Sequence, residues 1–219
     1  MPSKYSVKNY VENGVYHVYN RGVEKRKIFE DDQDYKVFLH YLKRYLTDED
    51  DEVRPRWKKE LSQRVSLLAY CLMENHFHLL VKQTTKDAVT IFMRCMSNAY
   101  TKYFNEKYDR IGPLFQGKFK AVLVDNDDYL LHLTRYIHLN PLGHKGLTRS
   151  DLAILENYLY SSYHDYLDKR NTLWLHRETV LEYFQSSRTL GTKYSSYKNF
   201  VEDFAVDPKI YLEDYTIDT

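Results

Sequence analysis

Two histidines separated by one residue, His76 and His78, are the side chains of this sequence best placed to do chemistry. They follow an apolar run, Ser66–Met73, and open a second strand-like run. Strand side chains alternate between faces, so both imidazoles share one face, about 7 Å apart at Cα from a rise of ~3.3 Å per residue. They can converge on one metal ion or one phosphate. An ordinary half-exposed polar pair is the alternative reading of this motif alone.

A second candidate pair lies further along the chain, where Tyr136 and Asn140 are four residues apart on a predicted helix and therefore on one face. The Asn140 oxygen and two imidazoles would form a three-ligand site suited to Mg²⁺ or Mn²⁺. A phenol with a pKa of about 10 is a weak nucleophile at neutral pH, and a metal that polarises a phosphoryl group compensates for this. Alternatively, Tyr136 packs in the core and Asn140 only ends the helix before Pro141.

The elements that must position these residues follow from the apolar periodicity. Four strands are predicted, at Val15–Tyr19, Ser66–Met73, Glu74–Lys82 and Gly117–Val124. Three helices are predicted as well. The first begins at Asp31 or Asp32, the second runs from Lys86 or Asp87 to Gly112-Pro113, and the third runs from Asn126 to Asn140. This β-α-β-β-α-β-α order predicts an α+β fold, a split β-α-β (ferredoxin/RRM-like) sandwich. It has a central antiparallel sheet with helices packed mainly on one face.

After Gly146 the sequence changes character, and three short helices are predicted in a C-terminal extension, at Tyr158–Asp168, Thr179–Phe184 and Tyr197–Phe204. We therefore divide the chain into a domain of residues 1–149 and a helical extension of residues 150–219. Their formal charges are +6 and −5, which together give the net +1 of the chain. A basic body with an acidic tail is compatible with phosphate binding.

The composition, at 219 residues and 43% hydrophobic, is that of a globular protein. The only two cysteines, Cys71 and Cys95, lie within apolar patterns, which argues against a disulfide scaffold and for a reducing compartment. The N-terminal residues lack the apolar stretch of a signal peptide, and no run is long enough for a membrane helix. We therefore expect a cytoplasmic protein with no membrane partner.

Two motifs carry a resemblance to a known family. The segment 75–80 (Asn-His-Phe-His-Leu-Leu), followed by 135–141 (Arg-Tyr-Ile-His-Leu-Asn-Pro), resembles the single-tyrosine transposases of the HUH endonuclease superfamily. Within these it is most similar to the REP-associated tyrosine transposases. The segments 16–22 and 112–119 also resemble this family, and 160–163 resembles an element that follows the domain. The resemblance covers roughly residues 10–150.

The resemblance implies a role for each matching residue. His76 and His78 correspond to the metal ligands, and Asn140 stands where the family places a polar third ligand. Tyr136 matches the nucleophile that attacks single-stranded DNA, leaving a 5′-phosphotyrosine and a free 3′-OH. The implied enzyme is an HUH-type tyrosine transposase, a single-strand DNA endonuclease that depends on Mg²⁺ or Mn²⁺.

Two positions depart from the family pattern. Glu74 stands where many relatives have Pro, and on a regular strand it would share the histidine face as an extra or competing ligand. Asn140 stands where the insertion-sequence branch has Gln. Tyr129, one heptad before Tyr136, is the reserve nucleophile.

The resemblance also implies that hairpin and single-stranded DNA is the substrate, read through base stacking, backbone charge and base pairing. The candidate nucleic-acid-binding residues flank the motif-bearing segments; they are Arg21, Lys118, Lys120 and Arg135. Lys118 and Lys120 share one face of the predicted last strand, which is either a phosphate-facing edge or the solvent side.

Two other functions remain open. A non-catalytic nucleic-acid-binding or regulatory protein could use the same sheet, although it would have no reason to keep His76, His78 and Tyr136 together. A small metallohydrolase with no covalent step would tolerate Tyr136→Phe but not His78→Ala. The relatives include dimers and monomers, so a homodimer is one assembly that the resemblance allows.

Overall fold

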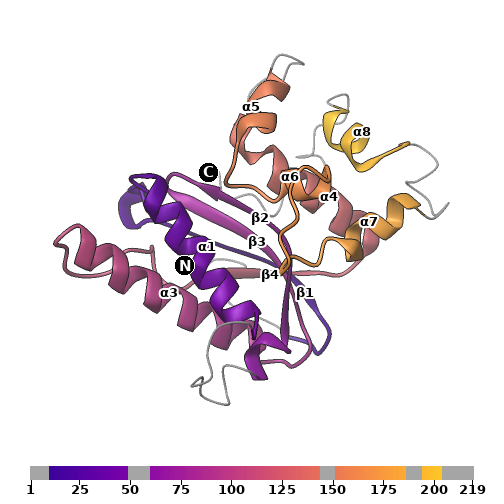
Figure 1. Cartoon of the computed structure of the whole chain (residues 1–219). Coiled ribbons are helices and arrows are strands. Elements are labelled where there is room, and N and C mark those ends of the chain that lie inside the picture. Colours follow the sequence, from indigo (N-terminus) through magenta and orange to yellow (C-terminus); the bar gives the residue numbers. More distant parts are fainter. Residues whose placement is uncertain (1–9, 49–59, 144–150, 186–193, 204–219) are drawn as a thin grey trace.

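Four antiparallel strands form the centre of the molecule (Figure 1). The structure, a computed structural model, describes residues 10–48, 60–143, 151–185 and 194–203. The strands are β1 (Val15–Arg21), β2 (Val65–Met73), β3 (His76–Gln83) and β4 (Lys120–Val124), and they lie in the order β2-β3-β1-β4. β1 and β3 are therefore central, and the predicted α+β, split β-α-β fold is confirmed.

One face of the sheet is covered by α1 (Asp32–Leu46) and α3 (Ala88–Lys107). Asp31 begins α1 in a capping box, in which its side chain accepts from the backbone N–H of Asp34 and the Asp34 side chain accepts in return. Phe77 points from β3 into this layer, with its ring 5.2 Å from that of Phe38. Alternation along β3 therefore directs Phe77, Leu79 and Val81 to this side and both motif histidines to the other.

The opposite face is covered by α4 (Asp127–Leu139), which begins where the Asn126 side chain accepts from the backbone N–H of Tyr129. Every residue of α4 from Tyr129 to Leu139 is buried. A helix buried all round must be covered on two sides, and here the sheet lies on one and the C-terminal extension on the other (Figure 1). Helices thus cover both faces, rather than mainly one as the sequence pattern predicted.

The extension contains α5 (Leu152–Asn157), α6 (Tyr163–Tyr166), α7 (Glu178–Gln185) and α8 (Tyr197–Glu202). Its chain runs along the outer edge of β2, with backbone hydrogen bonds from Leu72 N to Tyr160 O (2.9 Å), Ser162 N to Tyr70 O (2.9 Å) and His176 N to Leu67 O (2.8 Å). This pairing satisfies backbone groups that an edge strand would otherwise expose. The described part of the extension therefore packs against the first domain. The predicted boundary at residue 149 falls outside the described residues.

Several element ends differ from the sequence prediction. β1 continues through Arg21, the strand around Lys120 begins there rather than at Gly117, and α3 ends at Lys107. The helix predicted from Tyr158 is a single turn, α6, because its first residues pair with β2. No helix in the described part of the chain has the length and apolar character needed to cross a membrane.

Candidate active site

The side of the sheet beneath α4 gathers polar residues from three strands, and we call it the histidine face. Its polar members are His17, Tyr19, Arg21, His76, His78 and Lys120. The antiparallel register places Tyr19 directly opposite His78 and Arg21 opposite His76, while Lys120 is opposite Tyr19 on the other side. Directly opposed residues share a face, so this register brings imidazoles and cations to one end of the sheet.

His76 is half-buried at the start of β3, and its ring is oriented by the residue before it. Its Nδ1 lies 2.7 Å from Oδ1 of Asn75, and Nδ2 of Asn75 donates to the backbone carbonyl of Lys25 at 3.3 Å. Because the amide nitrogen of Asn75 is used at Lys25, its oxygen faces His76, and an oxygen can only accept. His76 therefore carries its proton on Nδ1, and Nε2 is the nitrogen with the lone pair.

His78 is fully buried, and its Nδ1 lies 2.8 Å from Nε2 of His17 on the neighbouring strand. The two rings are stacked, with centroids 5.1 Å apart and an interplanar angle of 17°. Burial lowers the pKa of His17 to about 3, so its imidazole is neutral. The rings of His76 and His78 are perpendicular with centroids 5.1 Å apart, an arrangement in which their Nε2 atoms can approach one ion.

Tyr136 comes from α4 and meets the histidines from the opposite layer. Its ring contacts His78 edge-on, with centroids 5.5 Å apart and an angle of 90°, and lies 6.3 Å from His17. Only 1% of Tyr136 is exposed. The structure therefore brings together His76, His78 and Tyr136, three residues chosen from sequence, and buries the tyrosine between α4 and the sheet.

Asn140 lies one turn after Tyr136, where α4 continues into the 3-10 helix η2 (Asn140–Leu142), and it is buried. Its Nδ2 donates to the backbone carbonyl of Tyr136 at 2.9 Å, so Oδ1 is the atom of this side chain that could bind a cation. Its place in a metal site stays a prediction.

The donor set fits a hard or borderline divalent cation. His76 and His78 each contact another side chain through Nδ1. A hydrogen bond at that nitrogen is the usual way in which a protein orients a histidine that binds a metal through Nε2. Among the described residues no group of three or more His, Cys, Asp or Glu side chains could hold a metal ion. A third ligand must then be of another kind, such as the amide oxygen of Asn140 or an oxygen of the substrate.

Glu74 is not on the strand that was predicted to carry it. It lies in the turn between β2 and β3, and its carboxylate forms a 2.6 Å ion pair with Lys27 on the surface. Alternation of strand faces does not apply in a turn, so the expectation that Glu74 shares the histidine face is corrected.

The exposed Lys120 and the half-buried Arg21 lie on the histidine face, and Lys118, which is also exposed, lies two residues before the start of β4. Arg21 donates through Nε to Oε1 of Gln116, and Nζ of Lys120 lies 5.7 Å from the ring centroid of Tyr19. A pocket of about 110 Å³ lies between them, lined by Tyr19, Asn20, Arg21, Gln116 and Lys120. Two cations at one small pocket beside the histidines suit a backbone phosphate.

Arg135, the fourth predicted nucleic-acid-binding residue, is fully buried. Its guanidinium lies 5.4 Å from the ring centroid of Phe200 on α8 and donates to the backbone carbonyl of Asp203. Arg135 therefore links α4 to the extension, and its guanidinium is buried in this structure. It is buried because α4 is covered on two sides, so a position off the sheet-facing stripe is not a surface position.

Tyr129, the reserve nucleophile, is buried in the first turn of α4, at the opposite end of the helix from Asn140. His17 was not among the candidate site residues, although its Nε2 lies 2.8 Å from Nδ1 of the motif histidine His78. In the sequence, His17 alternates with Tyr19 and Arg21 and so shares a face of β1 with them. That this face is the one that carries His76 and His78 follows only from the register of β1 against β3.

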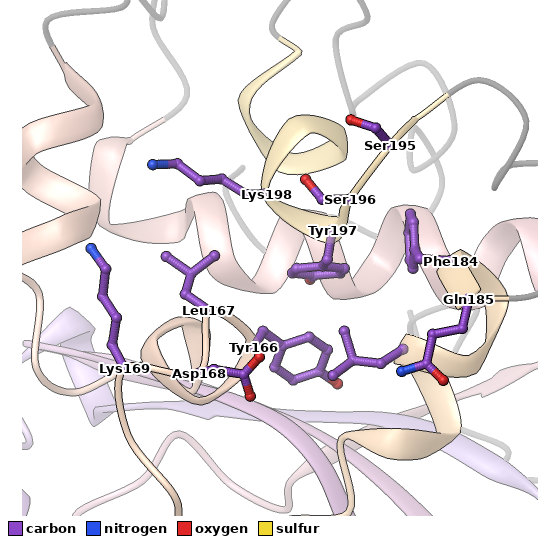
Figure 2. Close-up of a pocket in the computed structure, with 11 residues that line it drawn as sticks. Tyr166, Leu167, Asp168, Lys169, Phe184, Gln185, Ser195, Ser196, Tyr197 and Lys198 are labelled. Atoms are coloured by element: carbon purple, nitrogen blue, oxygen red, sulfur yellow. The ribbon is translucent and has the colours of Figure 1, made fainter.

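A separate pocket of about 390 Å³ lies within the C-terminal extension (Figure 2). Tyr166, Tyr197 and Phe184 supply aromatic walls, and Lys169 and Lys198 point along its rim. Both lysines are ion-paired with Glu156, at 3.5 and 3.2 Å. None of the candidate site residues lines this pocket.

Together the fold and the site define a class: α+β proteins in which a split β-α-β sheet presents a strand histidine pair to a tyrosine on a covering helix. A family profile described as "Transposase IS200 like" matches residues 10–140. The chain therefore belongs to the IS200-like transposase family. A search of the curated proteins found no match.

One solved structure shares the fold of this chain. The structure described as a REP-associated tyrosine transposase bound to a REP hairpin has a TM-score of 0.54 and 14% identity, and the match covers 78% of this chain and 96% of that one. A second, described as a candidate transposase from Deinococcus radiodurans, has a TM-score of 0.39 and 15% identity over 60% of this chain and 94% of that one.

Proposed function

We propose that this protein is an HUH-type tyrosine transposase, which nicks and joins single-stranded DNA through a 5′-phosphotyrosine at Tyr136. The observation that carries the proposal is the contact between Tyr136 and His78, whose rings meet at 5.5 Å although they come from separate layers. The family membership of residues 10–140 supports the same conclusion.

In the proposed reaction the phenolic oxygen of Tyr136 attacks the scissile phosphorus of a DNA strand. The bond from tyrosine oxygen to phosphorus forms, and the bond from phosphorus to the 3′ oxygen breaks. The phenol loses its proton and the departing 3′ oxygen gains one. Attack by a second 3′-OH on the phosphotyrosine reverses these bond changes and joins the strands, so no external energy source is needed.

His76, His78 and the amide oxygen of Asn140 would hold Mg²⁺ or Mn²⁺ in this reaction. Bound there, the cation would supply Lewis-acid polarisation of the phosphoryl oxygens. The protein's own contribution is orientation: β3 presents both imidazoles on one face, and α4 sets the phenol against them. Placement of reacting groups in this way removes much of the entropic barrier.

We further propose that the substrate is hairpin or single-stranded DNA. The fold match at TM-score 0.54 is to a tyrosine transposase bound to a REP hairpin. Arg21 and Lys120 at the small pocket and the exposed Lys118 would contact phosphates beside the scissile one. Arg135 is left out of this set because it is buried.

One observation favours a second function, that of a non-catalytic nucleic-acid-binding or regulatory protein. Tyr136 is 1% exposed, and its helix is held to α8 through Arg135. A nucleophile so covered can reach a phosphate only if the residues that cover it move when DNA binds. A protein that only binds DNA needs no such movement.

A covalent-adduct assay separates the two functions. Wild type, Tyr136→Phe and Tyr129→Phe are incubated with labelled single-stranded hairpins from the flanks of the gene, with Mn²⁺ or with a chelator. The readout is label that stays with the protein in denaturing detergent, and hairpin binding is measured in parallel. We expect a metal-dependent adduct in wild type and Tyr129→Phe, and none in Tyr136→Phe.

The other outcomes are equally informative. Loss of the adduct only in Tyr129→Phe would move the nucleophile to the start of α4. Tight hairpin binding without any adduct in the wild type would establish the binding protein instead.

A further inference from the structure

We propose that His17 is a positioning residue that sets the tautomer of His78, so that Nε2 of His78 faces the divalent cation. The inference rests on the proposed metal site and adds a residue to it. Its basis is the 2.8 Å contact between Nε2 of His17 and Nδ1 of His78 in the fully buried layer between β1, β3 and α4.

A ligating imidazole must offer a lone pair, so its proton has to reside on the other nitrogen. In His78 the other nitrogen is Nδ1, which then donates to Nε2 of His17. His17 must accept this hydrogen bond, and its own proton then resides on Nδ1. The pair thus has one arrangement compatible with a cation at Nε2 of His78, and His17 has to provide the acceptor.

Two further observations assign this role to His17 rather than a packing role alone. Its Nδ1 is buried and makes no hydrogen bond within the described residues, so the polar interaction of the ring is concentrated at His78. Buried polar groups that serve structure alone are normally satisfied throughout. The stacked geometry, at 5.1 Å and 17°, also fixes the plane of the His78 ring.

Asn75 performs the same task for His76. Its Oδ1 accepts from Nδ1 of His76 at 2.7 Å, and its amide is held in that orientation by the backbone carbonyl of Lys25. Glu24 and Lys25 are consecutive residues in the left-handed region, with φ of 57° and 60°. Backbone strain of this kind persists where the surrounding structure requires it, and here it aims a carbonyl at Asn75.

The turn that carries Asn75 is anchored to the end of β1 as well. The backbone N–H of Gly22 donates to the carbonyl of Asn75 at 2.9 Å. A Cβ at position 22 would lie 2.2 Å from the backbone oxygen of Arg26, so only glycine fits this close approach. β1 therefore supplies His17 for one histidine and anchors the support of the other.

Two substitutions at position 17 separate positioning from packing. His17→Gln keeps an acceptor at a similar reach but loses the ring, whereas His17→Phe keeps a ring but loses the acceptor. Mn²⁺ affinity of the full chain is measured by calorimetry and by electron paramagnetic resonance, and folding by circular dichroism. Asn75→Asp and Asn75→Leu form the matching pair for His76.

We expect His17→Phe and Asn75→Leu to weaken Mn²⁺ binding by about 10–100-fold, the usual effect of losing an outer-shell partner. His17→Gln should stay close to wild type, and Asn75→Asp should lose less affinity than Asn75→Leu, because it keeps the acceptor for His76 but not the donor to Lys25. If His17→Phe binds as tightly as wild type while His17→Gln is impaired, the ring serves only packing and the inference is wrong. If the wild type binds no Mn²⁺ at all, the proposed metal site itself fails, and the inference with it.

Histidine ¹⁵N shifts of the wild type provide a test that survives any folding defect in the variants. With saturating Mg²⁺ we expect the proton of His78 on Nδ1 and an unprotonated Nε2 in His17. A protonated Nε2 in His17 under these conditions would overturn the assignment.

Discussion

The two faces of the sheet bury polar groups in different ways. In the layer of α1 and α3, Asp34 at the start of α1 is fully buried, and both of its carboxylate oxygens accept hydrogen bonds. Lys107 approaches it at 2.7 Å, Tyr103 and Tyr108 donate at 2.9 and 2.8 Å, and the backbone N–H of Glu30 donates at 2.8 Å. A buried carboxylate satisfied in this way stabilises one packing arrangement and offers nothing to a ligand.

Beneath α4, the buried polar groups include the imidazoles of His17 and His78. These two rings share one hydrogen bond, and the ring of Tyr136 contacts both. The two faces therefore differ in the kind of polar group that they bury: one has a carboxylate held by several hydrogen bonds, and the other has a pair of stacked imidazoles against a tyrosine.

α4 itself carries a fully buried histidine that bonds to the C-terminal extension, so burial alone does not mark a site. His138 is fully buried, with Nδ1 2.7 Å from the hydroxyl of Tyr197 and Nε2 2.7 Å from Oγ of Ser162. Both ring nitrogens are used within the protein, and they tie α4 to the extension. The partners distinguish the two histidines: His138 bonds to the C-terminal extension, whereas His78 bonds to His17 on the neighbouring strand.

The largest expected effect is that of His78→Ala on catalysis. Metal polarisation of a phosphoryl group is worth several kcal/mol, and at 1.36 kcal/mol per tenfold the rate of adduct formation should fall by about 10³-fold. The variant also loses a buried ring and leaves Nε2 of His17 without its partner, so its free energy of unfolding should fall by about 3–5 kcal/mol, and its adduct rate is measured at a temperature where it is folded. Single-turnover kinetics measure the rate of adduct formation, and chemical denaturation measures the free energy of unfolding. An adduct rate within threefold of wild type would remove the functional distinction between the faces.

Asp34→Ala should lower the stability of the protein but leave its adduct rate unchanged. Removing the acid takes from Lys107 its buried partner, leaving the hydrogen bonds to Asp31 at 2.7 and 2.8 Å, and it takes away one half of a capping box. We expect the free energy of unfolding to fall by about 3 kcal/mol. The adduct rate of the remaining folded protein should be unchanged, because Asp34 lies on the other side of the sheet. Urea denaturation and an activity measurement at a temperature where the variant is folded test both halves.

Acid should destabilise the α1/α3 face through the same residue. Burial on its own would raise the pKa of Asp34, but the hydrogen bonds from Lys107, the Glu30 backbone, Tyr108 and Tyr103 outweigh it and hold that pKa below its ordinary value of 3.8. The unfolded chain therefore binds this proton at higher pH than the folded protein does. The stabilisation is fully present above about pH 4 and is lost as the pH falls from there through the folded pKa.

Asp34→Asn is the matched control, since the amide keeps the shape but does not titrate. Between about pH 4 and 2 the stability of wild type should fall more steeply than that of the variant, by up to about 1.4 kcal/mol per pH unit for one proton. Denaturation curves at several pH values measure the difference. Parallel curves for the two proteins would show that Asp34 is not the group that titrates.

The order of strands and helices, and the pairing of His76 and His78 with Tyr136, could be predicted because they depend on local periodicity and on motifs. His17 could not, because its contact to His78 depends on the register between β1 and β3, which no local pattern specifies. The burial of Arg135 could not be predicted for a related reason. Its helix is covered by a segment that begins after residue 150, and helical periodicity cannot show a second covering layer.

The smallest expected effect concerns the cations at the edge of the histidine face. The comparison here is between these solvent-accessible cations and the buried Arg135. Arg21→Gln or Lys120→Gln should each lower hairpin affinity by about fivefold and reduce the slope of log affinity against log salt by about 0.7–0.9, the value for one phosphate contact. Arg135→Met, in contrast, should lower the melting temperature and leave the salt slope unchanged, because its guanidinium lies against Phe200 and binds Asp203. Fluorescence anisotropy with a labelled hairpin from 50 to 200 mM salt, roughly the range over which counterion release is usually measured, gives all three slopes. A reduced slope for Arg135→Met alone would place the DNA on the α8 side of α4 and reverse the assignment of the two surfaces.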